Sequence, residues 1–383
     1  MSIALQIGPS ARTLTEWDQA TVTIDMLAPG CPFTVTLHRA GREESWQELL
    51  DDALVFAPLV LEVNGAVQVR GLIRRRRTGA DRQGRTLTVS GTDYAGVATV
   101  AEVPPTYSLK NTPLVAAIER LYAPLRIPVT VGAAATSAME TQTRTRRGSR
   151  GGGRARRRHP VDAIKVRGGE PIQAIADALC RRHGYLLYTA PFEGGVGLVI
   201  DRPNYDAPVR HRLTRRRVSD SPEGYEGNVV SAARDTDGTR VPSDATVFGH
   251  TGASSSSDAR VKVTVVNGGL DHPLVAGDRY PLPRYIRDRR ARSPQVAEQR
   301  GRREIARSMG DFDVYTATVR GFSFDGLVWA VNTMVRVEDD LEGVDGDWLV
   351  TRVEFSQNRQ TGPVTNLRLV PKGSLVVEPD EEV

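Results

Sequence analysis

The first hundred residues alternate between hydrophobic and polar side chains with the two-residue period that is typical of half-buried β-strands. Two alternating runs flank Asn64-Gly65, a dipeptide that tolerates the positive φ angles of a two-residue hairpin turn. Connected antiparallel strands of this kind favour a small barrel, which we expect over residues 1–100. The predicted strands are Thr21–Met26, Phe33–His38, Val60–Val63, Ala66–Ile73 and Arg85–Ser90, with a polar linker over Thr78–Gly84.

The pattern then changes to two helices, each followed by strands. Thr112 and Pro113 are typical of a helix start, and the apolar residues after them recur at helical spacing. A second helix is predicted from Pro171 to a stop at Gly184, and a hairpin follows it. These units predict a small α+β domain over residues 101–205.

Strand patterns dominate the rest of the chain. Residues 206–310 are predicted to mix short strands with a serine-rich loop and a helix, completing the second half of the molecule. Residues 311–377 are predicted to supply the strands of a second barrel, with an acidic loop over Asp340–Asp347, and residues 378–383 to form an acidic tail. The predicted fold class is therefore α+β and β-rich: tandem small β-barrels with an intervening α+β domain of helices and strands.

Composition indicates an ordinary water-exposed protein of several domains. The chain has 383 residues and lacks any long apolar run, so no membrane-spanning helix is expected. Its start lacks the basic residues and apolar stretch of a signal peptide, and we expect synthesis in the cytoplasm. The two cysteines, Cys31 and Cys180, lie in no CxxC motif, so free thiols are expected and zinc binding is not.

The formal net charge of +5 is concentrated in one segment. Residues 141–160 contain eight arginines and no acidic residue, and subtracting these eight from +5 leaves −3 for the rest. No apolar residue larger than alanine occurs there, which favours a solvated loop. The alternative is an arm that binds an acidic surface or a nucleic-acid backbone. Its candidate partner-contact residues are Arg144, Arg146, Arg147, Arg150, Arg154, Arg156, Arg157 and Arg158.

Motifs for catalysis are missing from the sequence. Its six histidines form no HExxH pair, and no GxSxG elbow, P-loop or dinucleotide-binding glycine motif occurs. Two acids are all that glycoside hydrolysis needs, but most of the carboxylate pairs fall in predicted turns, where acids are solvated. We predict no enzyme activity, no cofactor and no metal site. The carboxylate pairs are Glu43/Glu44, Asp51/Asp52, Asp339/Asp340 and Asp345/Asp347.

Three segments carry a family resemblance. They are the hairpin and strand that end in TLTVSGTDYAG, the helix and strand VRGGEPIQAIADALCRRHGYLLY over Val166–Tyr188, and the strand-rich run over Leu327–Pro371. In this order they resemble the baseplate hub proteins of contractile phage tails. The sequence is most similar to tail protein P of Mu-like phages, and more distantly to the late-control D proteins and the N-terminal region of type VI spike proteins.

The resemblance implies a structural protein of the virion, made in the host cytoplasm. In that family three copies form a ring that adapts a six-fold tail tube to a three-fold central spike. The implied partners are the other two copies, the spike, the tail tube or distal tail protein and the baseplate wedge proteins, with the tape-measure protein or passing DNA in the lumen. Two alternatives stay open: a tail-associated cell-wall glycan hydrolase, and a nucleic-acid-binding accessory protein that uses residues 141–160.

Overall fold

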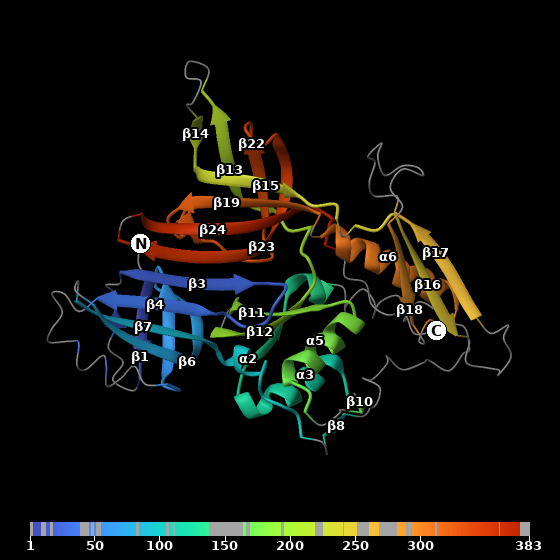
Figure 1. Ribbon diagram of the computed structural model, residues 1–383, viewed down its shortest axis with the longest axis horizontal. Helices are drawn as coiled ribbons and strands as arrows, with labels where there is room; N and C mark the ends of the chain where they lie inside the picture. The colour runs from blue at the N-terminus through green and yellow to red at the C-terminus, as the bar shows by residue number, and fades with distance from the viewer. Residues whose placement is uncertain are drawn as a thin grey trace.

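One large sheet organises the protein, and helices cover only part of it (Figure 1). The sheet has 14 strands, and three-stranded and two-stranded sheets surround it, which confirms the predicted α+β, β-rich class. The computed structural model describes residues 3–8, 13–15, 18–38, 46, 50, 55–81, 84–104, 107–109, 112–137, 164–165, 169–192, 195–218, 225–239, 241–250, 260–267, 282–288, 291, 293–310, 312–359 and 361–375.

The first half of the large sheet comes from the N-terminal strands β1 (Ile3–Ile7), β2 (Thr13–Leu14), β3 (Gln19–Asp25), β4 (Phe33–His38), β5 (Pro58–Val63), β6 (Ala66–Asp81) and β7 (Gly84–Asp93). They pair in the order β2-β1-β5-β6-β7-β4-β3. The turn between β5 and β6 holds Asn64 at φ 51° and Gly65 at φ 78°, so the predicted hairpin is confirmed. The predicted linker over Thr78–Gly84 is wrong, because β6 keeps its main-chain pairing with β7 as far as Asp81 opposite Gly84.

The second half comes from β13 (Val209–Arg217), β14 (Tyr225–Gly227), β15 (Val229–Thr236), β19 (Asp313–Arg320), β22 (Met334–Asp339), β23 (Val344–Asn358) and β24 (Gly362–Pro371). Here the pairing order is β14-β13-β22-β23-β24-β19-β15. The predicted acidic loop over Asp340–Asp347 is too long, because β23 already begins at Val344 and pairs with the end of β22.

The two halves have the same order of strand pairing. Taken in chain order, β13, β14, β15, β19, β22, β23 and β24 occupy the places that β1 to β7 occupy in the first half. Strand lengths repeat as well: β5, β6 and β7 have 6, 16 and 10 residues, and β22, β23 and β24 have 6, 15 and 10. One pairing differs, since β1 runs antiparallel to β5 whereas β13 runs parallel to β22. The chain therefore contains an internal duplication that its residues do not display.

The halves share one hydrophobic core. Val22 of β3 and Phe355 of β23 are register partners, and both are fully buried. Phe322 packs edge-on against Phe355 with the ring centroids 5.7 Å apart. Each large apolar side chain buried in this way contributes about 1.5–3 kcal/mol to folding, so the junction of the halves is part of the stable interior.

An α+β unit follows the first half and contains α2 (Tyr94–Val97), β8 (Ser108–Leu109), α3 (Leu114–Tyr122), η1 (Ala123–Leu125), β9 (Val129–Val131), β10 (Ile164–Lys165), α5 (Ile172–Arg182), β11 (Leu186–Phe192) and β12 (Gly195–Asp201). Its helices α3 and α5 pack together against the sheet β11-β12-β9. The predicted stop of α5 is confirmed: Gly184 has φ 75°, and the N–H of Tyr185 donates to the carbonyl of Cys180 at 2.8 Å. Helix α3 begins after Pro113, one residue later than predicted.

A second unit is inserted between β15 and β19. It contains β16 (Asp244–His250), β17 (Arg260–Val266), β18 (Pro283–Arg287) and α6 (Pro294–Met309), and a short hairpin of β20 (Ser323–Phe324) and β21 (Leu327–Val328) follows β19. Helix α6 starts at Ser293, whose side chain accepts a hydrogen bond from the N–H of Val296. It packs on β16 and β17 around a small core of its own that includes Val247 and Ala297. In Figure 1 this unit lies to the right of the large sheet.

His211 of β13 is buried in the second half without a hydrogen-bond partner for either ring nitrogen within the described residues. Its ring lies 4.3 Å from that of Trp329. Burial, helped by the charge of Arg210, lowers the pKa of His211 to about 4. An unfolded histidine has a pKa of about 6.5, so this group stabilises the fold fully above pH ~6.5, and that stabilisation is lost as the pH falls towards 4.

We therefore expect the free energy of unfolding to fall by about 2–3 kcal/mol through His211 between pH ~6.5 and 4. In His211→Phe, a ring that needs no hydrogen bond occupies the same site, and this part of the pH dependence should vanish while stability at pH 7 is kept. Urea unfolding of both proteins across this pH range checks the prediction. Parallel pH profiles of the two proteins would contradict it.

Candidate assembly surface

One face of the large sheet carries small polar side chains that continue from one half to the other. Two rows of register partners cross the halves: Ser90, Thr34, Thr21 and Ser356, and Thr23, Glu354, Asn366 and Thr318. Within the second row, the hydroxyl of Thr318 donates to Oδ1 of Asn366 at 2.8 Å, and Nδ2 of Asn366 donates to Glu354 at 3.0 Å. The opposite face is the hydrophobic core, so the polar face is built to meet water or a polar partner.

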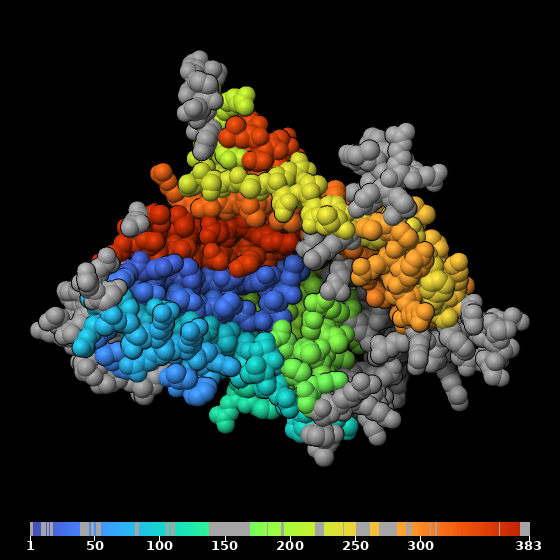
Figure 2. Space-filling view, viewed as in Figure 1, coloured from blue at the N-terminus to red at the C-terminus, as the bar shows by residue number. Residues whose placement is uncertain are grey.

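The halves meet where β3 pairs with the second part of β23. Residues Gln19–Asp25 run antiparallel to Arg352–Asn358, with Asp25 opposite Arg352 and Thr21 opposite Ser356. Figure 2 shows the result, because the N-terminal residues in blue lie along the C-terminal residues in red over a long boundary. We call this pairing of β3 with β23 the internal seam.

Two of the strand edges that remain open in the part of the chain that the structure describes belong to long strands of the large sheet. β15 pairs only with β19, and β6 beyond Ile73 pairs only with β7. Most of β15 is exposed, including Asp235 at its end. Because such edges present unpaired N–H and C=O groups, they are places where another strand can bind.

The open part of β6 is also strongly basic. It carries the consecutive residues Arg74–Arg77, and none of them has a carboxylate partner among the described residues. Some exposed arginines elsewhere do have carboxylate partners, as Arg212 and Arg216 do in Glu338. An unpaired run of positive charge beside an open edge favours an acidic partner.

A buried carboxylate cluster fixes the strands β13, β19 and β22 relative to one another. Asp339 accepts hydrogen bonds from Nε of Arg215 on both oxygens at 3.0 Å and from the hydroxyl of Tyr315 at 2.7 Å. Its Oδ1 also accepts from the N–H groups of Leu341 and Glu342. Burial would raise the pKa of Asp339, but the bonds from Arg215 and Tyr315 hold it below its usual value. Asp339 therefore stays charged and holds the polar end of the second half together.

Asn332 ties the second half to the α+β unit. Its backbone has φ 58°, and its Nδ2 donates at 2.9 Å to both Oδ2 of Asp201 and the carbonyl of Arg202. Its Oδ1 accepts from the N–H of Asn204 at 2.9 Å. The side chain thus bonds to three consecutive parts of the segment that leaves β12, which fixes the direction of that segment.

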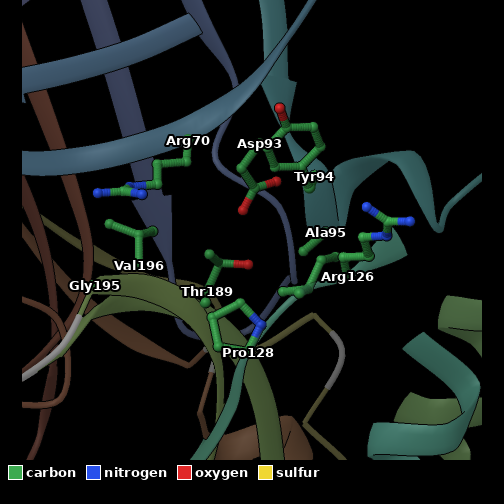
Figure 3. Close-up of a pocket in the computed structure, with 11 residues that line it drawn as sticks. Arg70, Asp93, Tyr94, Ala95, Arg126, Pro128, Thr189, Gly195 and Val196 are labelled. Carbon is green, nitrogen blue, oxygen red and sulfur yellow. The ribbon is translucent and has the colours of Figure 1, made fainter. Parts of the chain in front are cut away.

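A hollow of about 210 Å³ lies where the first half meets the α+β unit, with Arg70 and Arg126 at its sides (Figure 3). Asp93 and Thr189 point towards each other across its floor. Burial raises the pKa of the Asp93 carboxyl, whose Oδ1 accepts from the N–H of Gly96 at 2.7 Å and caps α2. The Thr189 hydroxyl accepts from the N–H of Gly30 at 3.2 Å. These contacts join two units of the protein, and they place one buried acid here rather than a pair.

The eight arginines between Arg144 and Arg158 that the sequence predicts as partner contacts lie outside the described residues. The arginines of β6 were not among the predicted partner contacts. The signal that marks them is a strand pattern whose alternation stops at Arg74–Arg77, where both faces become polar.

The predicted carboxylate pairs divide into two groups. Glu43/Glu44 and Asp51/Asp52 lie outside the described residues. In the other two, Asp339 binds Arg215, Asp340 accepts from the N–H of Arg217, and both Asp345 and Asp347 contact Arg336. The expectation that Asp345 and Asp347 lie in a loop is wrong, because they lie on β23 opposite Glu338 and Arg336, where Asp345 remains exposed to solvent as expected. The acids of both described pairs therefore serve as contacts for arginines of the large sheet.

Neither metal-binding groups nor membrane spans are found in the described part of the chain. No cluster of His, Cys, Asp and Glu side chains there has the arrangement that would hold a metal ion. No helix there has the length and apolar character needed to cross a bilayer.

Comparison with known proteins finds similarity in structure only. No protein-family model matches the chain, and no curated protein matches its sequence. The 43 kDa tail protein of prophage MuSo2 from Shewanella oneidensis matches with a TM-score of 0.75 at 18% identity, over 98% of this chain and 100% of that one. The tail protein from Neisseria meningitidis MC58 matches with a TM-score of 0.73 at 18% identity, over 99% of this chain and 98% of that one. The chain has the fold of these phage tail proteins.

A more distant match extends the comparison to secretion machinery. It is an E. coli component of the type VI secretion system, described as similar in structure to the T4 bacteriophage tail proteins gp27 and gp5. Its TM-score is 0.53 at 9% identity, over 98% of this chain and 79% of that one. The predicted resemblance is thus confirmed at the level of the fold of phage tail and spike-related proteins.

Proposed function

We propose that this protein is the structural hub of a contractile-tail baseplate, in a phage or a tail-like particle, and that three copies form its central ring. The observation that carries the proposal is the internal duplication within one continuous sheet. Three chains with two equivalent halves each present six similar surfaces, so a six-fold tail tube can bind one side of a three-copy ring. The shared fold with phage tail proteins supports this role.

We further propose that the ring also binds three-fold partners. The insertion between β15 and β19 supports this. Only a short turn separates β3 from β4, whereas the equivalent position in the second half holds β16, β17, β18 and α6. This unit is therefore present once per chain and three times per ring. It breaks the six-fold repetition and offers surfaces for a three-fold spike or for the surrounding wedge proteins.

The polar character of one face of the large sheet supports the proposal that this face lines the channel of the ring. Its threonine and serine rows cross the internal seam without an apolar interruption, and such a surface lets a tape-measure protein or DNA pass without binding it tightly. Residues 141–160, with the eight arginines Arg144 to Arg158, are proposed as a contact to that internal cargo.

We propose no catalytic role. The acids of the Asp339/Asp340 and Asp345/Asp347 pairs are engaged by arginines or by main-chain N–H groups, which disfavours the free pair of facing carboxylates that a glycosidase uses. A zymogram of the purified protein on cell-wall glycan should show no cleared band. A cleared band that is lost in a carboxylate variant would assign the hydrolase alternative instead.

The ring is tested by native mass measurement of the purified protein and by end-on images of the assembled particle. The expected mass is that of three chains of 41.8 kDa. The expected image has three-fold symmetry with a six-fold repeat in its inner wall. A single chain per intact particle would overturn the proposal.

A further inference from the structure

The two strands that are equivalent to those of the internal seam do not pair with each other within one chain. The seam joins β3 to the second part of β23. In the duplication, the strand equivalent to β3 is β15 and the strand equivalent to β23 is β6. Both of these strands have an open edge in the described chain: β15 on the side away from β19, and β6 beyond Ile73.

The equivalence holds at single residues. β6 has its irregular register between Ile73 and Arg75, and β23 has one between Val350 and Arg352. Counting from these bulges makes Arg75 the equivalent of Arg352. The bulges therefore fix one alignment of β6 with β23.

The other side of the seam aligns through the neighbouring strands. Thr21 lies opposite Thr34 of β4, and Ala233 lies opposite Thr316 of β19, which makes Asp237 the equivalent of Asp25. Both aspartates make the same local bond: Oδ1 of Asp25 accepts from the N–H of Leu27 at 2.8 Å, and Oδ1 of Asp237 accepts from the N–H of Thr239 at 2.9 Å.

We infer that β15 of one copy pairs antiparallel with residues 75–81 of β6 in the next copy, in the register of the internal seam. This inference rests on the proposed ring, and it specifies which strands join neighbouring copies. Carried over from the seam, Arg75 lies opposite Asp237 of the neighbouring copy, Arg77 opposite Asp235, Ala80 opposite Ala232 and Asp81 opposite Ser231.

Charge supports a second copy as the occupant of these edges. The register places two arginines of β6 against Asp235 of β15 and Asp237 just after its end, and the pair with Asp237 repeats the Arg352–Asp25 pair of the internal seam. Arg77 and Asp235 have no ionic partner within the described part of their own chain. Each copy carries both the β15 edge and the β6 edge, so the contact between copies is head-to-tail. It closes into a ring of three when each copy is rotated by a third of a turn relative to the next.

The contact between copies is more polar than the internal seam. Arg76 takes the place of Val353, which is fully buried in the internal seam. Strand pairing with exposed ion pairs weakens with salt, so the ring opens at high ionic strength while each chain stays folded.

Cross-linking tests the register. The variant Ala80→Cys/Ala232→Cys puts cysteines at opposed positions, whose Cα separation in an antiparallel pair suits a disulfide. Oxidation should give a covalent species of three 41.8 kDa chains on a non-reducing denaturing gel. Ala20→Cys/Gln357→Cys, the same pair in the internal seam, should oxidise within one chain. Ala80→Cys/Asp235→Cys, which is out of register, should remain monomeric on the gel.

A charge swap tests the chemistry. Arg77→Asp should weaken trimer formation at least about ten-fold, and the double variant Arg77→Asp/Asp235→Arg should restore it, because each contact again has one charge of each sign. Arg85→Asp is the control, since Arg85 is an exposed arginine of β7 and lies on the side of β6 that is already paired within the chain.

The outcomes separate the inference from the function on which it rests. A wild-type trimer that shows no link in Ala80→Cys/Ala232→Cys, while Ala20→Cys/Gln357→Cys oxidises fully, overturns the strand contact and leaves the ring standing. A wild-type protein that stays monomeric both in solution and in the particle overturns both. A covalent trimer together with restoration by the charge swap establishes the contact.

Discussion

Replacing Asp339 with alanine should lower the free energy of unfolding by about 3–5 kcal/mol, because it removes the buried counter-charge of the Arg215 guanidinium and leaves only the partly exposed Glu342 beside it. The side chain of Arg215 is only 7% exposed and that of Asp339 only 1%. The hydroxyl of Tyr315 and two main-chain N–H groups lose their acceptor at the same time. Chemical denaturation at neutral pH measures the loss.

The neighbouring acid provides the control. Asp340→Ala removes an exposed carboxylate that accepts one main-chain bond from Arg217, and it should cost less than about 1 kcal/mol. The double variant Arg215→Met/Asp339→Leu should recover much of the loss, since a buried ion pair can be replaced by apolar groups at little net cost. Equal effects of Asp339→Ala and Asp340→Ala would show that the cluster contributes nothing specific.

Replacing Asn332 with alanine should cost about 3–4 kcal/mol. Alanine tolerates the left-handed φ of 58° poorly, and it cannot bond to Asp201, Arg202 or Asn204. Asn332→Gly is the matched variant, because glycine accepts the backbone angle but lacks the amide.

The two variants divide the cost between backbone and side chain. Asn332→Gly should retain a loss of about 2–3 kcal/mol if the hydrogen bonds dominate, and thermal unfolding of both variants beside the wild type measures it. Wild-type stability of Asn332→Gly would contradict the assignment of Asn332 as a tie between the α+β unit and the second half.

Local features of the fold could be predicted from the sequence, and long-range ones could not. The hairpin at Asn64-Gly65 and the helix end at Gly184 could be predicted because both need positive φ angles, which asparagine and glycine adopt more easily than other residues. The alternating strand Phe33–His38 was predicted with its observed bounds. The second part of β6 was not, since Arg74–Arg77 breaks the alternation and the pairing with β7 alone keeps it extended.

The internal duplication is invisible to sequence reasoning for a physical reason. The two halves preserve which strands pair, but the residues at equivalent places differ, as Val22 and Arg234 do. Pairing between Asp25 and Arg352 depends on contacts far apart in the chain, which local patterns do not encode. The open edges of the candidate assembly surface depend on which strands pair, and local sequence patterns do not specify that pairing.

The internal seam sets a limit on how this chain matures on the ribosome. β3 is synthesised long before its partner β23 (Val344–Asn358). Until then the nascent first half carries an unsatisfied strand edge, which is prone to mispairing with other chains. A truncated product that ends before β23 should therefore aggregate, so only complete chains enter assembly in quantity.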